Sequence, residues 1–544
     1  PANNIASMRT IRRYTMSQQT PEYEYTPLAG HEIIRVLVLH PAATDNEVIQ
    51  CSFREITLWR GCSDSPQAYE ALSYTWGEPR GTRPILCHGK TLLITPNCEQ
   101  ALLHLRGKKE PRQLWVDAIC INQNSTEEKN EQVSLMTLVY QCALRTIIWL
   151  GQDTGKEISS LLREACPLQG RPSRRAKASK KLRKLSRIIR RDPLNPLLGE
   201  PGEEYYSEGD QEAYDFFEAD TARTEKAKEL CSNPWFRRVW TIQEFLLSES
   251  SIFLMGNVQC PPRDLYIYLK DLVPLRHADF DHYRLRHKFF NFGPKQGETA
   301  FQSFMYHTIR LIEQNNATDP RDKVYGMSAF IESKWPEIQF PAVDYSLSAM
   351  EIYENFTRAI IVASGSLWPL ELVVGAPEFG PGPATSWILD LRGPGHLAPA
   401  QNPDYLRFDW NCYDGWKPGP GKLAAEILRE EKKLKIRARR VSEAVRVVKA
   451  REALGFMCHF ESRFLSETMD ELCPVQSPGD VQVGDIVCTV EGSRVPLVLR
   501  IREGPNAIFI GRADISTYSF SFMYEPFDPA AWTDETQTDY LVLA

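Results

Sequence analysis

The chain has 544 residues, of which 42% are hydrophobic and 25% charged, and its formal net charge of -6 corresponds to a pI near 6.0. This composition is typical of a soluble globular protein, and the charge balance gives no reason to expect nucleic acid as a partner. The longest apolar runs, 145–151 and 358–365, are far shorter than the ~20 residues of a membrane-spanning helix, so no membrane span is expected.

The first part of the chain alternates strand-like and helix-like segments. From the N-terminus, we expect strands within 31–60 and at 69–77, a hairpin at 84–95 that turns at His88-Gly89, a helix at 96–105, a strand running into a loop at 113–123, a helix after Ser125, and a strand at 145–151. Ser125 and Glu128 match the S-x-x-E pattern of a capping box. The alternation predicts an α/β fold with a mainly parallel sheet flanked by helices, and a binding crevice beyond the carboxyl ends of the strands.

A charged insertion at about 165–222 interrupts this pattern. Eleven Lys and Arg residues lie between Arg171 and Arg191, and acidic residues crowd 200–220. We interpret the two blocks as a partly mobile hairpin whose halves attract each other, with nucleic-acid or lipid binding by the basic block as the alternative. Order resumes at Asn233 and Pro234, which suit the N-cap and first position of a helix reaching about Leu247.

Composition changes along the chain indicate five regions. They are an N-terminal tail at 1–30, an α/β domain with its charged insertion at 31–260, a helical region at 261–365, a Pro/Gly-rich linker region at 366–433, and a small β-rich C-terminal domain at 434–544. The 13 cysteines are scattered without a C-x-x-C pair, which favours reduced, buried thiols in a cytoplasmic protein. No metal site is expected.

Three motifs carry a family resemblance. They are "YEALSYTWGEP", "LWVDAICINQNSTEEKNEQVSLMTLVYQCA" with "IIWLG", and "PWFRRVWTIQEF". In this order, over roughly 69–247, they resemble the heterokaryon incompatibility (HET) domain of fungal proteins, and "DPRDKVYG" (319–326) and the segment that begins "VQVGDIV" resemble its flanking regions. The charged insertion and the C-terminal part depart from the family pattern, which leaves the role of the accessory region open. The resemblance implies non-self recognition and regulated cell death, with a second copy or another incompatibility protein as partner.

The resemblance extends to catalysis through TIR domains, to which the HET domain is distantly similar. Some TIR domains hydrolyse NAD with a glutamate in a W-x-x-x-E pattern, which Trp240 and Glu244 reproduce here. Residues at i and i+4 share one face of a helix, so this indole and carboxylate can line the same pocket. The resemblance therefore implies NAD as a substrate and no resident cofactor, with Glu244 as the catalytic carboxylate that stabilises an oxocarbenium-like centre.

Ser73, Trp76 and Asp117 end or follow predicted strands, where a doubly wound fold places its ligand contacts. With Trp240 they are the candidate substrate-binding residues around Glu244. We expect the Glu244 carboxyl to open into a concave site bordered by 73–77 and 117–123. The alternatives are structural: the tryptophans as core, Asp117 as an acceptor for loop amides, and Glu244 as a surface acid.

Two functions are thus compatible with the sequence. The first is a TIR-like NAD glycohydrolase, and the second is a non-catalytic signalling module that self-associates or binds a partner. An aromatic wall with one acid suits either, so the sequence alone separates them poorly.

Overall fold

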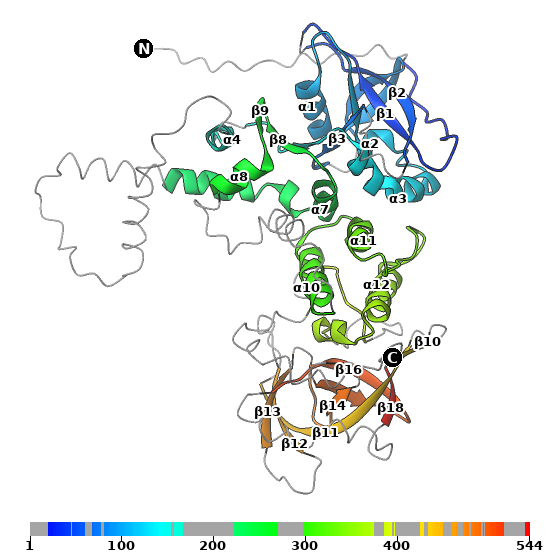
Figure 1. The fold of residues 1–544 in the computed structure, drawn as a ribbon, viewed down its shortest axis with the longest axis vertical. Helices are drawn as coiled ribbons and strands as arrows, with labels where there is room; N and C mark the ends of the chain where they lie inside the picture. The colour runs from blue at the N-terminus through cyan, green and yellow to red at the C-terminus, as the bar shows by residue number, and fades with distance from the viewer. Residues whose placement is uncertain are drawn as a thin grey trace, which may run out of the picture. The chain divides into compact units, whose positions relative to one another are not determined.

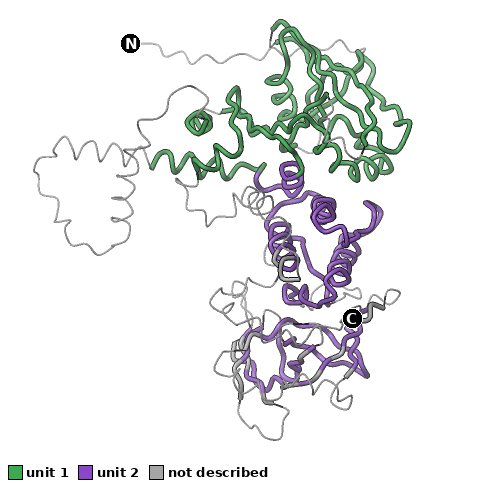
Figure 2. The backbone as a smooth tube through the Cα atoms, viewed as in Figure 1, with its two compact units in different colours: residues 1–235, 247–283 green, residues 236–246, 284–544 purple. Residues whose placement is uncertain are grey.

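The computed structural model describes most of the chain between residues 20 and 543. The described residues are 20–44, 46–59, 68–77, 81–153, 157–166, 221–269, 298–374, 386–393, 397, 425–428, 433–449, 458–464, 472–477, 480–490, 493, 496–515 and 539–543. The chain divides into two compact units (Figure 2). The first unit comprises 1–235 and 247–283, and the second comprises 236–246 and 284–544.

The first unit is built on a nine-stranded sheet in the order β5-β4-β2-β1-β6-β3-β7-β8-β9. Figure 1 labels β1, β2, β3, β8 and β9 of this sheet. Its strands are β1 (Ile33–Leu39), β2 (Gln50–Thr57), β3 (Glu70–Ser73), β4 (Arg83–Cys87), β5 (Lys90–Ile94), β6 (Arg112–Trp115), β7 (Thr146–Trp149), β8 (Ser251–Met255) and β9 (Val258–Cys260). Its helices are α1 (Pro96–Leu105), α2 (Asp117–Cys120), α3 (Thr126–Cys142), α4 (Ser159–Ala165) and α8 (Pro262–Leu269), and residues 221–231 are also helical.

The sheet is mixed, so the expectation of a mainly parallel sheet is wrong. Parallel pairing holds for β2 with β4, β3 with β6 and β7, and β7 with β8. The pairs β1–β2, β1–β6, β4–β5 and β8–β9 are antiparallel. The physical reason lies in the connections: β4 and β5, like β8 and β9, are joined by two-residue turns, which allow only antiparallel pairing.

Two features predicted from short sequence patterns, the start of α1 and the turn between β4 and β5, are confirmed. Thr95 accepts a hydrogen bond from the Cys98 amide, and Pro96 opens α1. The turn between β4 and β5 holds His88 and Gly89 at positive φ, 50° and 76°. The 113–123 segment differs, because after β6 the chain turns into α2 where a loop is expected.

The capping box at the start of α3 is only half formed. Ser125 accepts a hydrogen bond from the Glu128 amide at 3.2 Å, as a cap does. The Glu128 carboxylate does not reach back to the Ser125 amide but binds Arg35 on β1 and the amide of Asn122. The expectation of a complete box is therefore wrong.

The second unit combines helices with a β-rich part. The helices are α7 (Val239–Leu246), α10 (Glu298–Gln314), α11 (Asp322–Lys334) and α12 (Ala349–Ser364), followed by the 3-10 helix η5 (Trp368–Leu372). The strands are β10 (Ala425–Leu428), β11 (Lys433–Lys449), β12 (Cys458–Phe464), β13 (Leu472–Ser477), β14 (Ile486–Val490), β15 (Leu497–Ile501), β16 (Asn506–Arg512), β17 (Asp514–Ile515) and β18 (Asp539–Leu543).

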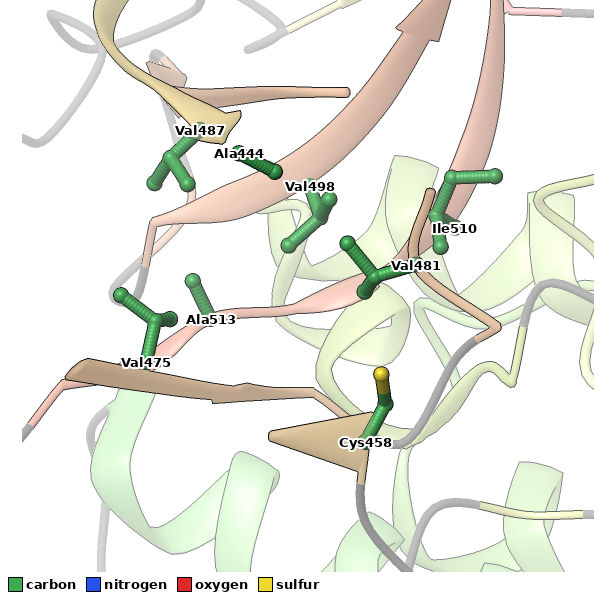
Figure 3. Close-up of a cluster of buried hydrophobic side chains, with 8 residues drawn as sticks. All are labelled: Ala444, Cys458, Val475, Val481, Val487, Val498, Ile510 and Ala513. Atoms are coloured by element: carbon green, nitrogen blue, oxygen red, sulfur yellow. The ribbon is translucent and has the colours of Figure 1, made fainter. Parts of the chain in front are cut away.

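The long strand β11 organises the second sheet, whose order is β14-β15-β16-β18-β11-β12-β13-β17, with β10 also paired to β11. Since β11 pairs with both β18 and β14, five strands close into a ring. Figure 3 shows a core cluster of this part: Ala444, Cys458, Val475, Val481, Val487, Val498, Ile510 and Ala513.

The region expected as a linker contains packed segments at 366–374 and 386–393. Trp387 and Leu389 are fully buried, and the Leu389 amide donates to Thr357 on α12 at 3.1 Å. On the other side, the Phe509 amide of β16 donates to Ser386 at 3.0 Å. These segments therefore join the helices of the second unit to its β-rich part.

The third sequence motif is not one continuous helix. Asn233 accepts from the Trp235 amide and opens the 3-10 helix η3 (Pro234–Arg237), and α7 begins only at Val239. The break lies at Arg238, which forms a bridge with Asn316: the Val239 amide donates to the Asn316 carbonyl at 3.0 Å. This distant backbone pairing overrides the local helix signal.

Two further expectations concern the cysteines and the charged insertion. Cys142 is disulfide-bonded, so the expectation of reduced thiols is wrong for this residue. The charged insertion lies almost wholly at 167–220, outside the described residues. Among the described helices, none is both long and apolar enough to span a bilayer.

Candidate functional site

The parallel centre of the first sheet contains a topological switch point. Its strands lie in the order β6-β3-β7-β8, so the chain leaves β3 for a neighbour on one side, β6, and later returns to the other side, β7. In open α/β sheets the ligand crevice lies outside the carboxyl ends of the strands at such a reversal. Ser73 ends β3, Trp149 ends β7, and Asp117 follows β6 by two residues.

Trp76 and Asp117 form a direct pair at these carboxyl ends. The indole Nε1 of Trp76 donates to Oδ2 of Asp117 at 2.8 Å, and the other carboxylate oxygen accepts from the Ala118 amide at 2.7 Å. Both side chains are partly exposed. The carboxylate thereby links the first turn of α2 to a partly exposed indole, which is a surface on which a nucleotide ring can stack.

Other polar groups tie the neighbouring strand ends together. Asn97 on α1 donates to the Thr75 carbonyl at 2.6 Å and accepts from the Trp149 indole at 2.9 Å. Ser73 is buried and accepts from the indole of Trp235 at 2.7 Å. The carboxyl ends of these strands are therefore held by side-chain hydrogen bonds between segments far apart in the sequence.

An ion pair between buried Arg35 and partly buried Glu128 holds the end of α2 and the residues that follow it. Arg35, 1% exposed, makes two hydrogen bonds to Glu128, at 2.5 and 3.0 Å, and donates to the Cys120 carbonyl at 3.2 Å. Burial alone would lower the pKa of Arg35, but the hydrogen bond and charge of Glu128 outweigh it and raise that pKa. Gln123 completes the loop by donating to the Asp117 carbonyl.

Trp240 and Glu244 lie on α7, within the second unit. Both belong to the same helix at i and i+4, as the W-x-x-x-E pattern requires. Trp240 is partly exposed, whereas Glu244 is only 2% exposed and its neighbour Gln243 1%. Glu244 is thus a buried carboxylate and not a surface acid.

The "DPRDKVYG" segment positions α7. A β-carbon added at Gly326 on α11 would lie 3.3 and 3.4 Å from the Val239 methyl groups and 3.6 Å from the Trp240 ring, so a larger residue here would press on α7. Lys323 on the same helix is buried and donates to the carbonyls of Ile312 and Asn315 near the end of α10. Burial lowers the pKa of Lys323 to about 8.

The structure thus brings together some of the sequence-predicted residues. Trp76 and Asp117 are in contact. Ser73 lies at the same carboxyl ends of the strands but is covered by Trp235. Trp240 and Glu244 share α7 in the other unit, so the concave site expected around Glu244 stays a prediction. In the "DPRDKVYG" segment, Asp319 forms a salt bridge with Arg321.

The sequence did not point to four residues that support the carboxyl ends of these strands: Arg35, Asn97, Trp149 and Trp235. One signal was available, because Arg35 is a lone charge in the apolar run "IIRVLVL". Such a residue must be paired if it is buried. No group of three or more His, Cys, Asp or Glu side chains within the described ranges could hold a metal ion.

Comparison with known proteins identifies the domain that carries this edge. Residues 69–244 match the family model described as heterokaryon incompatibility protein (HET). Residues 69–244 are a HET domain. The domain begins just before β3 and ends at Glu244, so it includes most of α7.

A curated relative supports the same assignment. The chain is 29% identical over 243 residues to "Heterokaryon incompatibility protein 6, OR allele" of Neurospora crassa. The alignment covers 41% of this chain and 33% of the relative, so the chain spans about one third of the relative's length. No solved structure matches the chain significantly.

Proposed function

We propose that this chain acts in the cytoplasm in heterokaryon incompatibility, as a protein of non-self recognition that leads to regulated cell death. A second copy or another incompatibility protein would be its partner. Its HET domain would be a TIR-like NAD glycohydrolase that binds the nucleotide at the carboxyl ends of β3, β6 and β7.

The observation that carries the nucleotide part is the Trp76–Asp117 pair at the switch point. An indole held by a carboxylate at 2.8 Å, with its ring partly exposed, offers a stacking surface where doubly wound folds bind nucleotides. Stacking on an aromatic side chain is worth about 1–3 kcal/mol per base. Asp117 therefore acts as the positioning group and Trp76 as the contact.

Glu244 would carry the chemistry. In the reaction the bond between nicotinamide N1 and ribose C1′ breaks, and its electron pair leaves with the pyridinium nitrogen, which becomes neutral. A water oxygen bonds to C1′ and releases a proton, giving ADP-ribose. A carboxylate near C1′ stabilises the positive charge that develops between these events. Trp240, on the same face of α7, would line the ribose.

A non-catalytic signalling module is the second candidate, and a specific observation favours it. Glu244 is 2% exposed, and Ser73 is covered by Trp235. If the structure shown is also the active form, substrate cannot reach this carboxylate. In that case the same groups hold the HET domain together, and function depends on partner binding.

Nicotinamide release separates the two candidates. The purified full chain is incubated with NAD, and nicotinamide is followed by chromatography for the wild type, Glu244→Gln and Glu110→Gln, the last being a control at an exposed glutamate. We expect release by the wild type and the control, and a loss of at least about 100-fold for Glu244→Gln, since removing one group that stabilises transition-state charge typically costs that much. If all three proteins were equally inactive, even at concentrations that favour assembly, the proposed NAD glycohydrolase activity would be rejected.

A further inference from the structure

Residues 20–28 begin at the edge strand β5 of the first unit's sheet, where residues 21–23 pair with Thr91. The Thr91 amide of β5 donates to the Pro21 carbonyl at 2.9 Å, and the Tyr23 amide donates back to Thr91 at 2.8 Å. Glu22 and Thr91 form an isolated parallel bridge. Pro21 and Pro27 have no N–H to donate, so this pairing cannot extend into a full strand. The backbone alone therefore attaches the segment only at one point.

Two tyrosine side chains provide most of the remaining attachment. Tyr23 and Tyr25 are partly buried, whereas Glu22, Glu24 and Thr26 are exposed, which is the alternation of an extended segment. Ring centroids of Tyr23 and Tyr25 lie 5.5 and 6.1 Å from that of Phe53 on β2. The contact is therefore aromatic and sits on one face of the segment.

Tyr25 also reaches α2, the helix that begins at Asp117. Its hydroxyl donates to the Ile119 carbonyl at 2.8 Å. Arg35 lies over the Tyr25 ring at 5.2 Å, donates to the Thr26 carbonyl at 2.5 Å, and donates to the Cys120 carbonyl at 3.2 Å. One guanidinium thus holds both the segment and the last turn of α2.

The contacts form a continuous path within the first unit. They run from Tyr25 and Arg35 to the end of α2, and from Asp117 at its start to the Trp76 indole. α2 has only four residues, so its two ends cannot move independently. A change at Ile119 must therefore be felt at Asp117.

We infer that Tyr25 and Arg35 are positioning residues for the Trp76–Asp117 pair, and that residues 20–28 are a strap whose detachment loosens this pair. The strap is held by one backbone bridge, two aromatic rings and one shared guanidinium, so it can be released without opening the sheet. Its consequence for nucleotide handling rests on the function proposed above, but its effect on α2 does not.

Hydrogen exchange of the full chain, followed by mass spectrometry, tests the strap. Tyr25→Phe removes the hydroxyl and keeps the ring, and Tyr23→Phe is the matched control, because the Tyr23 hydroxyl has no hydrogen bond within the described residues. We expect the amides of Ile119 to Ile121, which bond back to Val116 and Asp117, to exchange about five- to tenfold faster in Tyr25→Phe only. Arg35→Lys, which keeps the charge but loses the planar fork, should produce the same local change.

The outcomes are distinct. Faster exchange confined to α2, with an unchanged melting temperature, supports the strap, even if no form of the protein consumes NAD. Equal exchange in Tyr25→Phe and the wild type overturns it, as does a uniform increase over the whole sheet in both tyrosine variants. If NAD is consumed, Tyr25→Phe should raise KM more than it lowers kcat, and unchanged kinetics beside faster exchange would overturn the positioning role.

Discussion

The carboxyl-end cluster of the first unit and α7 of the second unit hold their candidate groups by different means. In the first unit, side chains bond to side chains across strand ends: Trp76 to Asp117, and Trp235 to Ser73. In the second unit, α7 is placed by backbone pairing with Asn316 and by its close approach to Gly326. Hydrogen bonds between side chains hold the first region, whereas backbone pairing and close packing hold the second.

This difference determines how each region should respond to substitution. A buried polar network fails when one member is removed, because its partner is left without compensation. A close helix contact fails when atoms are added, because the interior has no room for them. Substitutions that remove a polar side chain should therefore be most costly in the first unit, and substitutions that enlarge a side chain should be most costly in the second.

The largest expected effect is at Glu128, and Glu351, which occupies the same sequence pattern in another helix, provides the comparison. Glu128 and Glu351 both follow a helix N-cap serine by three residues. Glu128 binds buried Arg35, whereas Glu351 completes an exposed capping box with Ser348. We expect Glu128→Ala to lower the free energy of unfolding by about 3–5 kcal/mol, since it leaves a buried charge unpaired. Glu351→Ala should cost only about 0.5–1 kcal/mol.

Urea unfolding of the full chain measures both losses. The matched position in the two helices makes each variant the control of the other. Similar losses for Glu128→Ala and Glu351→Ala would mean that the Arg35 pair is not buried in solution, and would remove the contrast between the two units.

Glu70 ties together the opposite, amino ends of β3, β6 and β7. It accepts from Arg112 at 2.9 Å and from Arg145 at 2.7 Å. Burial alone would raise the pKa of Glu70, but the hydrogen bonds and charges of the two arginines outweigh it and lower that pKa below 4.5. Glu70→Gln should therefore cost about 1.5–3 kcal/mol at neutral pH, the value of a hydrogen bond to a charged group.

The pH dependence of this loss follows from its sign. Because the carboxyl has a lower pKa in the folded chain, the unfolded chain takes up the proton first as the pH falls. The stabilisation is present above the unfolded pKa of about 4.5 and disappears as the pH falls through the folded pKa. The difference between wild type and Glu70→Gln in urea unfolding should thus shrink in acid. A difference that is constant with pH would contradict the charge-based tie.

Signals between close neighbours in sequence predicted much of the fold. Thr95 and Pro96 predicted the start of α1, and His88-Gly89 predicted the turn between β4 and β5. The placement of Trp76 and Asp117 after strands also indicated a shared edge, and their side chains do meet. Such features depend only on a few adjacent residues.

Choices among distant partners could not be predicted in this way. Glu128 is within reach of Ser125 in the sequence, yet its carboxylate pairs with Arg35, 93 residues earlier, because only the folded sheet brings that charge beneath α3. The third motif likewise has a good helix pattern, but Asn316 pairs with its backbone and breaks the helix at Arg238. Burial of Glu244 is a third such case, since it depends on what covers α7.

The smallest expected effect concerns Gly326, where two local terms oppose each other. Alanine in place of a helical glycine gains about 1 kcal/mol of helix propensity, but its β-carbon would meet the Val239 methyl groups at 3.3 and 3.4 Å. Overpacking a filled core costs about 1–3 kcal/mol, so we expect Gly326→Ala to lower the free energy of unfolding by about 1 kcal/mol.

Val239→Ala provides the test of this explanation, because it removes the methyl groups that the new β-carbon would meet. Alone it should destabilise α7 by leaving a small cavity, but in the Gly326→Ala background the added methyl fills part of that space. The double variant should therefore be more stable than the sum of the two single losses by at least about 0.5 kcal/mol, measured by urea unfolding as a double-mutant cycle. Additive losses would show that α7 and α11 are not in close contact at this point, and that packing does not position the helix carrying Glu244.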